Sequence, residues 1–129
     1  MTALLATLAA LLPAADHKPL PCWTVACRER VAMHDCSQAR PIACIRRAAL
    51  HQRVSFTLLH ARAWCESRLI PWASNGSHSG LFQFRTAEPS TWATTPYADR
   101  DPLRAKWNAL AAAWMERRGR GSEWACWPT

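Results

Sequence analysis

The chain has 129 residues, half of them hydrophobic, which is enough for one domain with a modest core and too few for two full domains. Its net charge is +7 and its isoelectric point is near 9.7, so polyanions are the expected partners: nucleic acid, an acidic membrane surface or an anionic cell wall. No internal repeat or low-complexity segment is present, so repeat architectures and long disordered tracts are excluded.

Residues 1–15 are predicted to be a signal peptide. The apolar run at residues 3–12 is too short to span a bilayer, and "PAA" offers a cleavage site near Ala15. Because no Lys or Arg precedes the run, a retained helix or a wrongly assigned start codon is the alternative. The expected location is secreted or cell-wall associated, with a periplasmic or phage-borne location left open, and stable membrane insertion is not expected.

Residues 16–41 form a segment rich in cysteine and proline, which we interpret as a disulfide-stapled arm. The chain has an even number of cysteines and no C-x-x-C pair, which favours disulfides over a zinc site built from Cys36, Cys44 and His34. The cysteines are Cys22, Cys27, Cys36, Cys44, Cys65 and Cys126.

Two helices are predicted next. Pro41 suits the first turn of a helix that continues through residues 42–52. Ser55 is a candidate N-cap for a second helix over residues 56–67, and Pro71 prevents its continuation. Residues 73–80 are polar and contain the turn signal Asn75-Gly76, and "LFQF" at residues 81–84 is predicted to be a short strand or edge ribbon.

The remainder is predicted to be helical. Pro89 and Pro96 restrict the segment between them to a short helix or turn. In the last helix Asp101 is the expected cap, Pro102 the first residue and Gly119 the end. Its apolar stripe is Leu103, Trp107, Leu110, Ala111 and Trp114. The predicted fold is therefore mainly α, of the α+β kind, with a short β-hairpin or ribbon.

Glu66 is the candidate catalytic residue. It lies near the C-terminal end of its helix, where the helix dipole disfavours a negative charge, and bulky aromatic residues are available to bury it. Burial raises the pKa of a carboxyl, and a general acid needs a raised pKa at neutral pH. The alternative is an ordinary surface ion pair with Arg62, four residues earlier.

The segments "CESRLIPWASNGSHSGLFQF", "STWATTPY", "DPLRAKWNALAAAW" and "EWACW" together resemble the lysozyme-like superfamily. The sequence is most similar to single-domain lytic transglycosylases and to muralytic domains of the resuscitation-promoting-factor type. The resemblance covers residues 42–127, implies a lysozyme-like catalytic domain over residues 42–129, and leaves residues 1–41 outside.

The resemblance implies roles for individual residues. Glu66 matches the catalytic acid, and Ser67 the serine that orients its carboxylate. The substrate-binding residues implied or left as candidates are Gly80, Gln83, Trp92, Tyr97, Trp107 and Asn108. Trp107 stands where the family usually has tyrosine, and Ile70 where asparagine often precedes the proline, so no tyrosine hydroxyl is expected at the first position.

The resemblance also suggests a disulfide and a mechanism. A Cys65–Cys126 bridge would tie the tail to the catalytic helix, and the other four cysteines allow three connectivities, of which Cys22–Cys27 with Cys36–Cys44 is one. Glycosidases usually need two carboxylates. A convincing second one was not found among Glu88, Asp99 and Asp101. This favours the single-glutamate reaction that forms a 1,6-anhydromuramoyl end.

The predicted function is cleavage of the β-1,4 bond between N-acetylmuramic acid and N-acetylglucosamine in peptidoglycan glycan strands. The protein is expected to work as a monomer, without a metal or other cofactor and without binding nucleic acid. Three alternatives stay open: a hydrolytic muramidase, a non-catalytic wall-binding module, and a basic nucleic-acid-binding or membrane-active protein.

Overall fold

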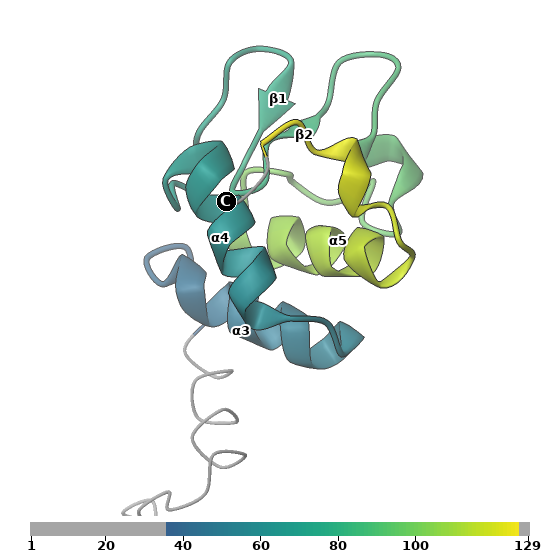
Figure 1. Cartoon of the computed structure of the whole chain (residues 1–129). Coiled ribbons are helices and arrows are strands. Elements are labelled where there is room, and N and C mark those ends of the chain that lie inside the picture. Colours follow the sequence, from purple (N-terminus) through teal and green to yellow (C-terminus); the bar gives the residue numbers. More distant parts are fainter. Residues whose placement is uncertain (1–35, 127–129) are drawn as a thin grey trace, which may run out of the picture.

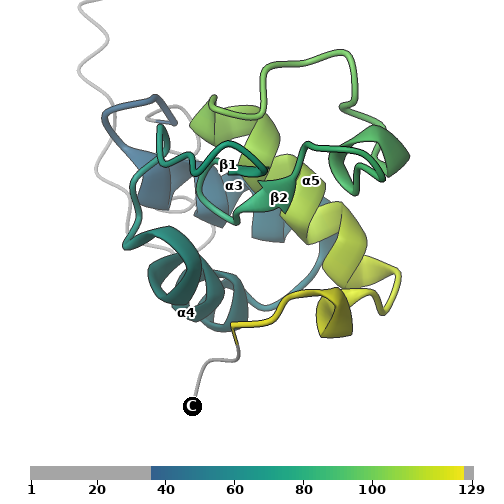
Figure 2. The ribbon, with the colours of Figure 1, turned by 90° about the horizontal axis from the view of Figure 1, so that it is seen from above.

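A computed structural model describes residues 36–126 (Figures 1 and 2). This part of the chain is mainly helical and carries one two-stranded antiparallel sheet, as the sequence predicted. In chain order the elements are α3 (Pro41–Gln52), α4 (Phe56–Ser67), β1 (His78–Ser79), β2 (Phe84–Arg85), the 3-10 turn η1 (Trp92–Thr94), α5 (Ala105–Arg117) and the 3-10 turn η2 (Gly121–Glu123). The predicted signal peptide, the arm before Cys36 and the pair Cys22–Cys27 lie outside the described residues.

Helices α3 and α4 have the predicted bounds because local signals mark their ends. Pro41 occupies the first turn of α3, and Arg53 ends that helix in the left-handed conformation at φ +55°. Ser55 caps α4, since its hydroxyl accepts a hydrogen bond of 3.1 Å from the N–H of Leu58. A Cys36–Cys44 disulfide, with 4.5 Å between the Cα atoms, anchors the end of the arm to α3 and confirms that part of the predicted pairing.

Helix α5 begins later than predicted. The Asp101 carboxylate accepts from the N–H of Leu103 at 2.9 Å, but this bond closes a turn, and the helix starts only at Ala105. The N–H of Ala105 donates at 2.8 Å to the side-chain oxygen of Gln38, which comes from the end of the arm. At the other end, Gly119 lies just past the helix with φ +72°, as the sequence predicted.

The core surrounds α5, which lies across α3 and below the two strands (Figure 1). Six consecutive residues of α5, from Asn108 to Ala113, are buried, so this helix is covered on nearly every side. Trp107 and Trp114, predicted for its apolar stripe, are only partly buried. The alanines let neighbouring elements approach closely, and the larger core side chains are Ile45, Leu59, Leu81, Phe82, Phe84 and Met115.

The sheet pairs His78 with Arg85 and Ser79 with Phe84. The strand predicted over residues 81–84 reaches only its last residue, because the chain turns between Gly80 and Gln83, both at positive φ. After α5 the chain folds back toward α4, and it runs past η2 on the way (Figure 2). The segment 78–85 and the segment 121–126 thus lie over the C-terminal end of α4, where Glu66 is found.

Candidate active site

Glu66 lies in the last turn of α4 and is partly buried. Desolvation raises the pKa of its carboxyl above the ordinary value of 4.5. A hydrogen bond from the N–H of Cys126, 3.2 Å from Oε1, and the charges of His78 and Arg62 favour the ionised form without cancelling that effect. The carboxyl therefore has the property expected of a general acid.

The suggested surface ion pair between Glu66 and Arg62 is wrong. Arg62 is only 2% exposed, and its guanidinium lies 3.4 Å from the Glu116 carboxylate on α5. It also donates to the carbonyl of Gly121 and lies 4.6 Å from the ring centre of Trp124. Arg62 therefore joins α4, α5 and the C-terminal segment, and a buried cation needs such partners.

The predicted Cys65–Cys126 disulfide is confirmed, with 5.9 Å between the Cα atoms. It joins residues 61 positions apart and holds the C-terminal segment against α4. Because Cys126 also supplies the N–H that bonds Glu66, the disulfide fixes the backbone donor beside the acid. On the chain-entropy model a closed loop of this length stabilises the fold by roughly 4 kcal/mol.

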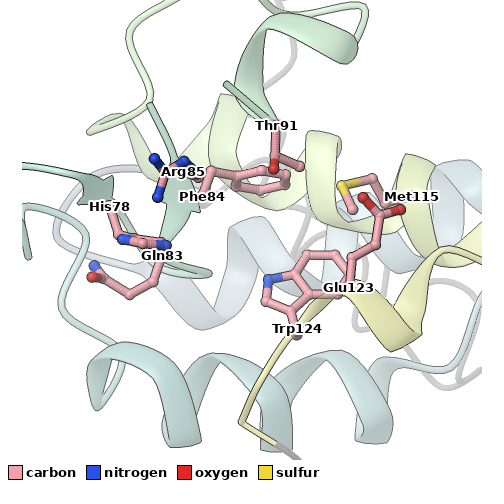
Figure 3. Close-up of a pocket in the computed structure, with 8 residues that line it drawn as sticks. All are labelled: His78, Gln83, Phe84, Arg85, Thr91, Met115, Glu123 and Trp124. Atoms are coloured by element: carbon pink, nitrogen blue, oxygen red, sulfur yellow. The ribbon is translucent and has the colours of Figure 1, made fainter. Parts of the chain in front are cut away.

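A pocket of about 150 Å³ lies between the small sheet and the C-terminal segment (Figure 3). Glu66 is not among the residues that line the pocket. Its carboxyl interacts electrostatically with His78, which does line it, and accepts a hydrogen bond from Cys126, two residues after the lining residue Trp124. The residues that line the pocket are His78, Gln83, Phe84, Arg85, Thr91, Met115, Glu123 and Trp124.

Gln83 is the predicted substrate-binding residue that the structure brings into this pocket. Its backbone has φ +47°, which is uncommon for a residue with a long side chain. Its side-chain nitrogen donates to the carbonyls of Ala73 at 3.1 Å and Gly80 at 2.9 Å. These bonds hold the amide in one orientation, and strained backbones of this kind concentrate at functional sites.

Three other predicted residues do not line the pocket: Asn108 and Ser67 lie beneath the segment 78–85, and Gly80 belongs to that segment. Asn108 is fully buried, accepts from the N–H of Phe82 at 2.8 Å, and donates to the carbonyls of Ser79 and Pro102. Gly80 packs directly on it, since a Cβ there would lie 2.2 Å from the Asn108 side-chain nitrogen. The expectation that these residues contact substrate is corrected: Asn108 supports the segment 78–85 from below, and Gly80 allows the backbone of that segment to approach Asn108 closely.

Ser67 belongs to the same support. Its hydroxyl is buried and donates to the carbonyl of Leu81 at 2.7 Å, with a second contact of 3.1 Å to the carbonyl of Ala63. The hydroxyl therefore ties the end of α4 to the segment that carries Gln83, and it does not orient the Glu66 carboxylate. The catalytic helix and the pocket wall are positioned relative to each other through this bond.

None of the predicted aromatic residues lines the pocket. Trp92 is 5% exposed, packs edge-on against Phe84 and donates its indole N–H to the carbonyl of Arg100 at 3.2 Å, so it is a core residue and not a floor for a sugar. Tyr97 and Trp107 are partly buried against each other, with 5.9 Å between ring centres. Neither lines the pocket.

The sequence analysis missed several pocket residues. Trp124 lies within the noted "EWACW" segment, and its indole N–H donates to the carbonyl of Phe82 at 2.8 Å. Thr91 lines the pocket and directly precedes Trp92, the residue that the resemblance implied as a substrate contact. Glu123 is a pocket carboxylate that was not among the predicted candidates for a second carboxylate. Its pKa lies below the usual value because Arg120 donates a hydrogen bond to it. The remaining ones are His78 and Arg85.

Residues 36–126 contain neither a metal-binding cluster nor a membrane-spanning helix. Within this range no group of three or more histidines, cysteines or acidic residues is arranged to hold a metal ion. None of the helices described there is both long and apolar enough to cross a membrane.

No protein-family model matches the chain, and neither curated proteins nor solved structures give a match. The function therefore has to be inferred from the chemistry of the site.

Proposed function

We propose that this chain is a lysozyme-like glycosidase that cleaves peptidoglycan glycan strands, with Glu66 as the general acid. One observation carries the proposal: a partly buried carboxyl with a raised pKa interacts electrostatically with His78, which lines a pocket next to the sheet. A protonated carboxyl beside a pocket can protonate the leaving oxygen of a glycosidic bond, and a positioned acid contributes about 10²–10⁴-fold in rate.

The proposed reaction is that of a lytic transglycosylase. Glu66 donates its proton to the glycosidic oxygen as the C1–O bond breaks, which leaves an oxocarbenium-like state at C1. The Glu66 carboxylate then removes the proton of the C6 hydroxyl of the same sugar, and that oxygen bonds to C1. The product is a 1,6-anhydro end, no water is consumed, and Glu66 is protonated again.

The pocket offers groups that suit a sugar ring. Gln83 presents a fixed amide, and Phe84 and Trp124 supply the apolar surface on which the C–H face of a pyranose packs. The two disulfides within residues 36–126 fit an exported protein, because disulfides persist in oxidising compartments. A net charge of +7 suits an anionic wall.

The test is to incubate the oxidised protein with purified sacculi and identify the soluble fragments by mass spectrometry. We expect fragments that weigh one water less than hydrolysis products. Glu66→Gln should lower the rate by at least about 100-fold. Glu88→Gln, which removes the same charge from an exposed loop, should leave the rate unchanged. A Glu66→Gln variant that solubilises sacculi at the parent rate would refute the proposal.

A hydrolytic mechanism is the second candidate, and Glu123 is the observation that favours it. The environments of Glu66 and Glu123 push their pKa values in opposite directions, which is the pattern of an acid and an ionised partner in two-carboxylate glycosidases. In that mechanism Glu123 activates water or bonds to C1, and the product has an ordinary reducing end.

Glu123→Gln separates the two mechanisms. It should leave anhydro products and most of the rate if Glu66 acts alone, and abolish turnover if Glu123 takes part. Because it also breaks the ion pair with Arg120, Arg120→Gln is the matched control: it breaks the same pair and keeps the carboxylate. Loss of activity in Glu123→Gln but not in Arg120→Gln would favour hydrolysis.

A further inference from the structure

One wall of the pocket carries two basic side chains. His78 on β1 and Arg85 on β2 are direct partners across the antiparallel pair, so their side chains project from the same face of the sheet. Both line the pocket, and Figure 3 shows the Arg85 guanidinium close to the His78 ring and on the same side as Gln83.

No carboxylate among the described residues forms an ion pair with Arg85. Its Nη2 donates to the backbone carbonyl of Glu88 at 3.1 Å, while its Nε is buried and has no hydrogen-bond partner within residues 36–126. A buried donor without a partner costs free energy, and no carboxylate within residues 36–126 pairs with this guanidinium to offset that cost.

The carboxylate of the pocket lies on the opposite wall. Glu123 is grouped with Met115 and Trp124 in Figure 3, and it is paired with Arg120. The pocket therefore has a cationic end at the sheet and a neutralised end at η2, with the aromatic rings of Phe84 and Trp124 between them (Figure 3). This polarity would orient a ligand that has a negative charge at one end.

We infer that Arg85 and His78 form an anion subsite that binds a carboxylate of the substrate, with Arg85 as the main contact. The inference rests on the proposed function and adds the substrate class: glycan that carries a free carboxylate next to the sugar in the pocket. A volume of about 150 Å³ corresponds to roughly five water molecules, which is room for a carboxylate-bearing substituent. Guanidinium groups suit carboxylates because they donate two parallel hydrogen bonds.

Peptidoglycan offers this chemistry from two sources. The lactyl group of muramic acid ends in a carboxylate wherever the stem peptide has been removed. The stem peptide itself carries carboxylates further from the ring. Strands made only of N-acetylglucosamine carry neither, so the subsite would distinguish wall glycan from neutral glycan.

The experiment is an NMR titration of the oxidised wild-type chain with N-acetylmuramic acid and, separately, N-acetylglucosamine. Neither sugar has a glycosidic bond, so turnover does not interfere. We expect N-acetylmuramic acid to bind at least about tenfold more tightly, to shift the signals of the pocket segment, and to weaken as salt is added. Equal affinities for the two sugars would overturn the inference.

Variants assign the preference to Arg85. Arg85→Gln should remove it, and Arg85→Lys should keep part of it because the charge remains without the planar fork. Arg117→Gln, an exposed change on α5 with the same loss of charge, should keep the full preference. A preference that survives Arg85→Gln in a folded variant would refute the assignment.

A third ligand, N-acetylmuramoyl-L-alanyl-D-isoglutamine, separates the two sources. In this ligand the lactyl carboxylate is converted to an amide, while the peptide still carries a carboxylate. If the Arg85-dependent preference is lost, Arg85 binds the lactyl carboxylate; if it is kept, Arg85 binds the peptide carboxylate. The outcome is independent of catalysis. Sacculi cleaved through Glu66 without any sugar preference would refute the subsite alone, and an Arg85-dependent preference without cleavage would refute the glycosidase alone.

Discussion

The two sides of the segment 78–85 are built differently. On the lower side, buried side chains bond its backbone: Ser67 to the carbonyl of Leu81, and Asn108 to Phe82 and Ser79. On the pocket side, Gln83 and Arg85 face the open volume, and Arg85 keeps a donor without a partner within residues 36–126.

This difference shows how neighbouring polar residues take separate roles. The side chains below the segment form hydrogen bonds that define its shape, so removing them should cost stability. Gln83 and Arg85 also bond nearby carbonyls, but they line the pocket, so removing them should cost binding or turnover and less stability than removing the side chains below. The comparison matters because Asn108 and Gln83 are both amides, and the sequence analysis treated both as substrate contacts.

The largest effect is expected from Asn108→Leu. It removes the hydrogen bonds of the Asn108 side chain to the N–H of Phe82 and to the carbonyls of Ser79 and Pro102, and each buried group left without a partner costs about 1–3 kcal/mol. We expect the free energy of unfolding to fall by about 4 kcal/mol, measured by urea denaturation. Gln83→Leu is the matched change on the pocket side and should cost about 1 kcal/mol while it removes turnover. Similar losses of stability at Asn108 and Gln83 would contradict the separation into supporting and ligand-binding side chains.

A smaller effect is expected from Gly80→Ala. Both Gly80 and Gly76 have positive φ, at +85° and +90°, so alanine at either site carries a backbone penalty of roughly 1–2 kcal/mol. At Gly80 the new Cβ would also lie 2.2 Å from the Asn108 side chain and 2.3 Å from the carbonyl of Pro102, which should add about 2 kcal/mol. At Gly76 nothing lies within 4 Å. Thermal unfolding of the two variants isolates the packing contribution, and equal losses would show that the close approach is unimportant.

Local signals predicted the elements well. The ends of α3 and α4 were predicted because Pro41, Ser55 and the residues around them act within one helical turn. The start of α5 was not predicted correctly. Its first N–H is bonded to Gln38, 67 residues earlier in the chain, and no local pattern reveals such a partner. Asp101 followed by Pro102 carries the same signals whether a helix or a single turn follows.

At the site, the sequence predicted Glu66, Gln83 and the Cys65–Cys126 bridge. It could not show which polar side chains face the pocket and which are buried beneath the segment 78–85. Asn108 and Trp92 have residue types that suit sugar binding, and only the packing shows that both are buried. Arg62 was paired with the wrong carboxylate for a similar reason. Its real partner is on α5, which is brought near by tertiary folding.

The smallest effect concerns pH and Glu66 itself. Because burial raises the pKa of Glu66, the folded protein still binds its proton at a pH where the unfolded chain has released it. The ionised carboxylate therefore destabilises the folded protein above the folded pKa, and this destabilisation disappears as the pH falls below 4.5, where both states are protonated. Glu66→Gln keeps an oxygen for the N–H of Cys126 and should be slightly more stable than the parent at pH 7.

Thermal unfolding of both proteins from pH 7 to pH 4 measures this difference, which should shrink toward zero at the acidic end. Glu123→Gln should behave with the opposite sign, since Arg120 lowers the pKa of Glu123: its loss of stability is present at pH 7 and fades as the pH falls through the folded pKa. A Glu66→Gln variant less stable than the parent at pH 7 would mean that the carboxylate is favourably paired in the folded protein. The pKa of Glu66 would then be lowered in the folded protein, which is the opposite of what a general acid needs.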